Sequence, residues 1–161
     1  MRPSYTARMR STTAFLLAAL ALPLAAQQPK QAPVVLFVCE HGAAKSVVAA
    51  AHFNKMAAEK GLAVRAIARG TDPDAEMNPI AVKGLAGDGL GASGKPQRVS
   101  ADEVTTARRA VALGCDLKQV APNAKIEQWD DVPPMGQDYG AARKVIVDHI
   151  RQLLAEMEAG R

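Results

Sequence analysis

Apolar residues follow two different spacings along this chain, and these spacings predict the order of its secondary structure. Runs of strand-forming residues occupy 34–39, 62–68 and 109–113, and a weaker run occupies 125–129. Near the C-terminus, residues 138–157 carry apolar side chains three and four positions apart, which is the spacing of a helix with one buried face. Those side chains are Ala142, Ile146, Ile150, Leu153 and Met157.

Residues 46–60 also predict a helix, because they are rich in strong helix formers and are followed by a glycine. Two shorter helices are predicted from their caps. Asn78 stands directly before a proline, and Ser100 stands three residues before a glutamate, which is the spacing of a capping box. The glycine-rich stretch 84–94 has no Gly-x-Gly-x-x-Gly opening a helix after a strand, so we expect a loop there and no dinucleotide site.

Strands that alternate with helices predict an α/β fold, because each crossover between parallel strands places a helix on one face of the sheet. We expect a three-layer α/β/α domain over residues 33–158, with a four-stranded, mostly parallel sheet. In such sheets ligands bind at the carboxyl ends of the strands. The loop after residue 39 lies at one of these ends, and Cys115 follows another strand.

The N-terminal 26 residues differ from the rest of the chain. Three arginines and no acidic residue lie within 1–10, residues 14–22 are apolar, and small residues follow. This pattern predicts a cleaved signal peptide over 1–26 and a polar tether over 27–32. We therefore expect an exported protein, periplasmic or secreted, with no stable membrane anchor after cleavage. An uncleaved anchor is the alternative, although the apolar run is short for a membrane span.

The composition of the chain limits the classes of partner that it is expected to bind. At 161 residues and 48% hydrophobic, the chain is long enough for one domain with its own core. Loss of the three N-terminal arginines lowers the formal net charge from +4 to about +1, so charge gives no argument for a DNA or RNA partner. Histidine, cysteine and carboxylate residues do not recur at metal spacing, so no metal or other cofactor is expected. His52 is expected to be a polar residue at the surface or its boundary.

The residues after the first predicted strand carry the candidate chemistry. Cys39 ends that strand, a short loop follows, and the next helix begins near Lys45 and Ser46. Unpaired amides and the helix dipole at such a turn favour a bound anion and lower the pKa of a thiol placed among them. Lys45 can add a full positive charge. The same spacing also occurs by chance around an ordinary buried cysteine.

Cys39, five further residues, Lys45 and Ser46 resemble the nucleophile loop of the low-molecular-weight protein tyrosine phosphatases and of the thiol-dependent arsenate reductases that share their fold. The resemblance extends over residues 33–157. Residues 111–115 are similar to a segment of some arsenate reductases, and a tryptophan precedes the last helix, as in the family.

The resemblance implies a role for each residue of the loop. Cys39 would be the nucleophile that forms a covalent thiol intermediate, and Ser46 would steady its thiolate, unless Ser46 is an ordinary helix cap. Lys45 stands where the family has arginine. The oxyanion would be bound by the backbone amides of Glu40, His41, Gly42, Ala43, Ala44 and Lys45.

Two departures from the family pattern predict weak catalysis. Lysine is a flexible point charge and lacks the planar fork with which arginine clamps two oxygens. The family's phosphatases have an aspartate directly before a proline as general acid, and Pro133 and Pro134 stand there instead. Asp131, a few residues earlier, is the candidate replacement. Glu40 is expected to face solvent, since a carboxylate turned inward would oppose a bound anion.

Three functions remain open. The first is hydrolysis of phosphomonoesters through Cys39. The second is arsenate reduction, in which Cys39 attacks arsenate and Cys115 resolves the adduct as a disulfide with the help of a thiol reductant. The third is non-catalytic binding or sensing of a small oxyanion. Whether Cys39 and Cys115 form a disulfide in the exported protein is left open.

Overall fold

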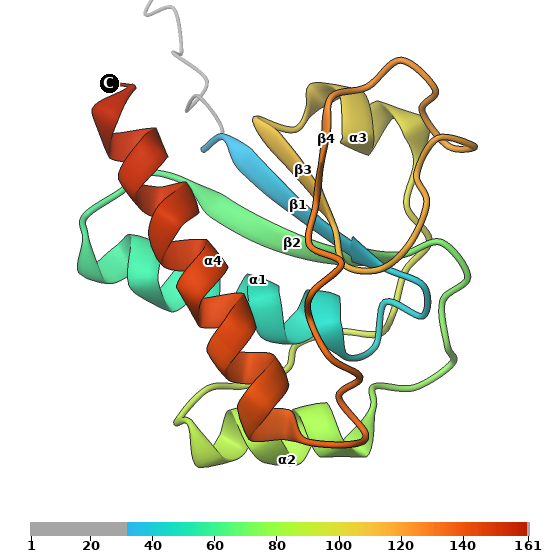
Figure 1. Ribbon diagram of the computed structural model, residues 1–161, viewed down its shortest axis with the longest axis vertical. Helices are drawn as coiled ribbons and strands as arrows, with labels where there is room; N and C mark the ends of the chain where they lie inside the picture. Colours follow the sequence, from blue (N-terminus) through green and yellow to red (C-terminus); the bar gives the residue numbers. More distant parts are fainter. Residues whose placement is uncertain (1–31, 161) are drawn as a thin grey trace, which may run out of the picture. The chain divides into compact units, whose positions relative to one another are not determined.

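The computed structural model describes residues 32–160 (Figure 1). The predicted signal peptide over 1–26 lies outside the described residues, as does the tether over 27–32 except for its last residue. None of the helices within 32–160 combines the length and the apolar character that crossing a membrane requires.

Four parallel strands form the sheet, as predicted. They are β1 (Val34–Cys39), β2 (Arg65–Gly70), β3 (Arg109–Ala112) and β4 (Ile126–Gln128), and their order across the sheet is β2-β1-β3-β4. β1 pairs on both sides, with Phe37 opposite Ala68 in β2 and opposite Val111 in β3. The central strand therefore delivers Cys39 to the middle of the carboxyl edge of the sheet.

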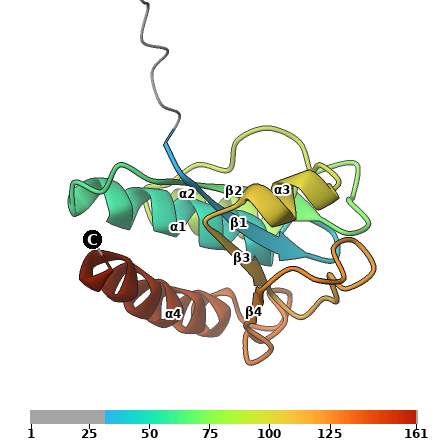
Figure 2. The ribbon, with the colours of Figure 1, turned by 90° about the horizontal axis from the view of Figure 1, so that it is seen from above.

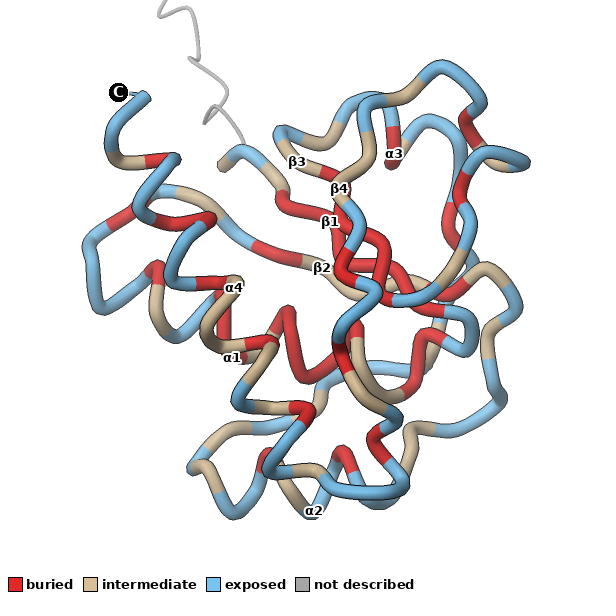
Figure 3. The backbone as a smooth tube through the Cα atoms, in the orientation of Figure 1, coloured by how far each residue is buried: buried red, intermediate tan, exposed pale blue. Residues whose placement is uncertain are grey.

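Helices cover both faces of the sheet, which confirms the three-layer architecture. They are α1 (Lys45–Glu59), α2 (Pro79–Gly87), α3 (Ala101–Thr106) and α4 (Tyr139–Ala159). Figure 2 shows α3 and α4 on opposite sides of the strands. Buried positions run along β1 and the inward sides of α1 and α4 (Figure 3). Alternation in β1 feeds two cores, because Phe37 packs with α1 and α4 while Leu36 packs with α3.

The predicted loop over 84–94 is partly wrong, because α2 continues through Gly84 to Gly87. A glycine is needed inside this helix because a Cβ atom at Gly84 would collide with the ring of Tyr139 on α4. The glycine that suggested a loop instead allows two helices to approach closely. The close approach of Gly84 and Tyr139 cannot be predicted from the sequence, since these residues are far apart along the chain.

His52 is buried rather than at the surface, with 5% of its area exposed. Its Nε2 donates to Oδ2 of Asp88, at the end of α2, over 3.2 Å. The same oxygen accepts from the hydroxyl of Tyr139 at 2.6 Å and from Nε of Arg143 at 2.7 Å. One carboxylate therefore joins α1, α2 and α4.

Protonation states follow from this cluster. Burial lowers the pKa of His52 below its ordinary value of 6.5, more than the nearby Asp88 carboxylate raises it. Burial alone would raise the pKa of Asp88, but the hydrogen bonds from Tyr139 and Arg143 outweigh it and lower that pKa. The folded protein therefore holds a neutral His52 beside an ionised Asp88.

The depressed pKa of His52 makes stability depend on pH. Folding favours the neutral ring, so this contribution is fully present above about pH 6.5 and is lost as pH falls toward the lower folded value. We expect the free energy of unfolding, measured by urea denaturation, to fall between about pH 7.5 and about pH 5 by more in the wild type than in His52→Gln. Equal losses in the two proteins would show that His52 is not held neutral.

Candidate active site

Cys39 lies at the end of β1 with 4% of its area exposed, and its Sγ lies 3.2 Å from Oγ of Ser46 in a buried hydrogen bond. Ser46 is fully buried in the first turn of α1. It is not the N-cap of that helix, because Ala44 occupies the position and no side chain caps the amides there. The geometry therefore pairs the Ser46 hydroxyl with the Cys39 thiol.

The loop from Cys39 to Lys45 is held by its carbonyl groups. The carbonyls of Cys39, Glu40, His41 and Ala43 accept from backbone amides in the segment after β2, over 2.8 to 3.1 Å. The donors are Thr71, Asp72, Asp74 and Asn78. The N–H groups of residues 40–45 donate to no other group within the described chain. The loop therefore has its acceptors satisfied and its donors available for an anion.

Gly42 and Gly70 allow this packing. Gly42 has a φ of +61°, in the left-handed region, and a Cβ atom there would lie 2.7 Å from the backbone nitrogen of Gly70. A Cβ atom at Gly70 would lie equally close to the nitrogen of Gly42. The loop after β1 therefore crosses the end of β2 with the two backbones in direct contact, which only glycine permits at both positions.

A cavity of about 230 Å³ opens above Cys39. The loop supplies one side of it, including Glu40, His41 and Lys45, and the end of β3 and residues 134–136 supply the others. Glu40 faces solvent as expected, with 68% of its side chain exposed. Within the described part of the chain, no phenylalanine, tyrosine or tryptophan lines this cavity. It is large enough for a tetrahedral oxyanion.

Lys45 is half-buried between two other segments of the cavity wall. Its Nζ donates to the carbonyl of Val132 over 3.5 Å. Gly114, with a φ of +70°, lies on the other side, where an added Cβ atom would be 3.1 Å from Nζ. An ammonium group has three donors, so one directed to Val132 leaves two for a bound anion.

Cys115 is close to Cys39, but both cysteines are free thiols. The Sγ of Cys115 donates to the carbonyl of Val38, next to Cys39, over 3.5 Å. Burial, followed by the negative charge of Cys39, raises the pKa of Cys115 to about 11. Cys115 is therefore protonated at neutral pH and is a weak nucleophile there.

Asp131, the candidate general acid, does not line the cavity. Its two carboxylate oxygens accept from Nε2 of His149 on α4, over 2.8 and 3.0 Å. The structure thus brings Cys39, Lys45 and Ser46 together and places Asp131 in a different contact. Sequence reasoning did not identify His149 or Val132, because one is distant in sequence and the other contributes only a carbonyl oxygen.

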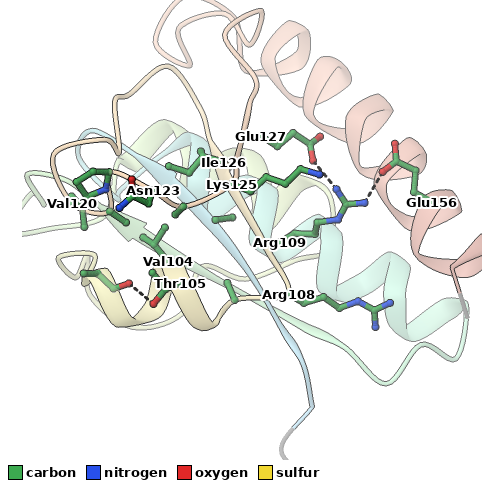
Figure 4. Close-up of a pocket in the computed structure, with 16 residues that line it drawn as sticks. Val104, Thr105, Arg108, Arg109, Val120, Asn123, Lys125, Ile126, Glu127 and Glu156 are labelled. Carbon is green, nitrogen blue, oxygen red and sulfur yellow. Dashed lines mark hydrogen bonds and ion pairs between the residues drawn. The ribbon is translucent and has the colours of Figure 1, made fainter.

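A larger cavity, of about 820 Å³, lies between α3 and the segment that leads into β4 (Figure 4). Arg109 pairs there with Glu127 over 3.8 Å and with Glu156 over 2.8 Å, so its charge is neutralised. None of the residues that the structure describes around this cavity is a cysteine or a histidine. The larger volume of this cavity therefore does not make it the candidate active site. Residues 32–160 also contain no cluster of side chains suited to a metal ion.

Comparison with known structures gives the same architecture. YfkJ from Bacillus subtilis is 21% identical, with a TM-score of 0.74 over 83% of this chain and 99% of that protein. A protein tyrosine phosphatase from Entamoeba histolytica is 18% identical, with a TM-score of 0.72 over 80% of this chain and 98% of the other. A thioredoxin-dependent arsenate reductase from Corynebacterium glutamicum is 22% identical, with a TM-score of 0.67, and the matched region covers 83% of this chain.

The present chain spans 66% of that arsenate reductase. At these identities the likeness shows the fold alone, and the neighbours include both phosphatases and arsenate reductases. No curated protein matches the sequence. The model of one family, described as low molecular weight phosphotyrosine protein phosphatase, matches residues 34–159. This chain therefore belongs to the low-molecular-weight protein tyrosine phosphatase family.

Proposed function

We propose that this protein hydrolyses phosphomonoesters through a cysteinyl-phosphate intermediate on Cys39, as a phosphatase of the protein tyrosine phosphatase type. The observation that carries the proposal is the 3.2 Å hydrogen bond between Cys39 and Ser46 beneath a loop of unpaired amides. A hydroxyl that donates to sulfur favours the thiolate, and the amides offer the oxyanion a set of fixed donors. A buried structural cysteine would need neither.

The reaction takes two steps on these residues. The amides of residues 40–45 and the ammonium of Lys45 bind the phosphoryl oxygens, and the Cys39 thiolate attacks phosphorus. The sulfur–phosphorus bond forms as the bond to the leaving oxygen breaks, and the alcohol departs after taking up a proton. Water then attacks the phosphocysteine, releases inorganic phosphate and returns the thiolate to its hydrogen bond with Ser46.

Protonation of the leaving group is the weakest step. Asp131 is bound to His149, and among residues 32–160 the titrating side chains on the cavity besides Cys39 and Lys45 are Glu40 and His41. Aryl leaving groups need little protonation, so they are the preferred substrates in this proposal. Turnover is expected to be slow.

Arsenate reduction is the second candidate, because the Sγ of Cys115 donates to the carbonyl of Val38, the residue next to Cys39. Cys39 would form a bond to arsenic as one arsenate oxygen leaves as water. The Cys115 thiolate would then attack the Cys39 sulfur and break the sulfur–arsenic bond, whose electron pair stays on arsenic. That attack yields a disulfide and releases arsenite, and an external dithiol would restore both thiols. Burial, which is the main cause of the raised pKa of Cys115, disfavours this route.

We also propose export. The arginines in residues 1–10 and the apolar run over 14–22 support this proposal, and compartment bears on mechanism because Cys39 must be reduced to act. An exported enzyme of this type would require a thiol reductant as a partner.

Substitutions at the loop test the catalytic proposal. On p-nitrophenyl phosphate with reductant, Cys39→Ser should lower kcat/KM by at least about 100-fold, because the nucleophile is lost. Lys45→Arg should raise it by about threefold to tenfold, because a fork binds two oxygens. Lys125→Arg, remote from this cavity, is the matched control. Full activity in Cys39→Ser would exclude the mechanism. No turnover, with phosphate still protecting Cys39 from alkylation, would leave a non-catalytic oxyanion binder.

Cys115 separates the two candidate reactions. Cys115→Ala should keep aryl phosphate hydrolysis within about twofold, since this thiol takes no part in it. The same variant should abolish any arsenate reduction, measured as arsenite released in the presence of a dithiol. If a folded Cys115→Ala protein lost hydrolysis, the claim that Cys115 takes no part in the phosphatase reaction would be wrong.

Mass spectrometry of the full chain expressed in a bacterium tests export. The mature protein should be found outside the cytoplasm and should begin at Gln27, the residue after the predicted peptide. Leu17→Arg, which breaks the apolar run, should keep the protein inside at full length. An intact Met1 on wild-type protein in the cytoplasm would refute the proposal.

A further inference from the structure

One wall of the Cys39 cavity is the loop between β4 and α4, and a histidine outside the cavity fixes this loop. Val132 and Met135 are buried, and residues 134–136 line the cavity. The loop contains two consecutive prolines and no regular secondary structure. Its position therefore depends on contacts with the elements around it.

His149 provides such a contact from α4. Its ring stacks on the indole of Trp129, with ring centroids 4.6 Å apart and planes 13° from parallel. Trp129 is 1% exposed and donates from Nε1 to Glu127 over 2.8 Å, so the platform beneath the histidine is fixed. From this position Nε2 of His149 lies within 3.0 Å of both carboxylate oxygens of Asp131.

The backbone links this contact to Lys45. Asp131 precedes Val132, whose carbonyl accepts from Nζ of Lys45 over 3.5 Å. A lysine side chain has a flexible four-carbon stem, so its charge is directed only where a neighbour holds it. Gly114 leaves room for Nζ on one side, and the Val132 carbonyl holds it on the other.

We propose that His149 and Asp131 are positioning residues, which hold the Val132 carbonyl so that it directs the Lys45 ammonium at the bound oxyanion. The inference rests on the proposed function, because it assigns Lys45 to oxyanion binding at the Cys39 site. It gives Asp131 a different role from that of the general acid. The carboxylate acts through the backbone beside it and does not touch the substrate.

Affinity for inorganic phosphate tests this inference separately from catalysis. It is measured as protection of Cys39 from iodoacetamide in the full-length protein. His149→Ala and Asp131→Ala should weaken phosphate binding by about threefold to tenfold, and raise KM for aryl phosphate in the same proportion. His149→Gln, which keeps a donor, should stay within about twofold of the wild type. Asp148→Ala, which removes an exposed ion pair with Lys144 on the same helix, is the matched control.

A double-mutant cycle distinguishes positioning from a general loss of structure. In a Lys45→Ala background, His149→Ala should produce no further loss of phosphate affinity, because the group that it positions is absent. Melting temperatures of all variants monitor folding. An equal loss in both backgrounds would overturn the inference, as would unchanged affinity in His149→Ala.

The outcomes for the two proposals differ. Wild-type protein that binds phosphate with the expected pattern among variants, but never turns over aryl phosphate, supports the positioning role and refutes the catalytic proposal. Turnover that depends on Cys39, with phosphate affinity that is unchanged in the His149 variants, supports the catalytic proposal and refutes the positioning role. Phosphate that fails to protect wild-type Cys39 overturns the positioning role as well.

Discussion

The backbone hydrogen bonds between the loop after β1 and the segment after β2 are the constraint on which the site depends. They occupy the carbonyls of Cys39, Glu40, His41 and Ala43 and leave the loop amides without partners. The contact between Gly42 and Gly70 makes this arrangement possible, because any side chain would separate the two backbones. The anion site is therefore formed by the course of the backbone, and it requires few charged side chains.

The two sides of the cavity differ in what they are made of. The loop side is backbone, fixed between the central strand and α1. It also carries one lysine, Lys45. The other side is an irregular segment, and the Val132 carbonyl of that segment holds the lysine. Where the family has arginine, the planar guanidinium group itself fixes the geometry of oxyanion binding. With lysine, that geometry must come from neighbouring residues, and the contact from His149 to Asp131 is one source of it in our proposal.

Local signals in the sequence predicted the fold well. The caps at Asn78 and Ser100 form as expected, since each depends on residues within three positions. Interactions between distant residues were missed or misread. His52 was placed near the surface because its partners lie 36 or more positions away, and the contact between Asp131 and His149 was missed because that histidine lies on another element. The pairing of Cys39 with Ser46 was anticipated only through the resemblance to the family.

α4 takes part in two of these long-range contacts. It is one uninterrupted helix of 21 residues, about 30 Å long. Tyr139 and Arg143 hold Asp88 at the end of α2, and His149 holds Asp131 further along the same rod. The same helix therefore contacts both the end of α2 and the segment that leads into one wall of the cavity, two parts of the chain that are far apart in sequence. The side chains in these contacts all lie outside the loop of residues 39–45 that holds the sulfur.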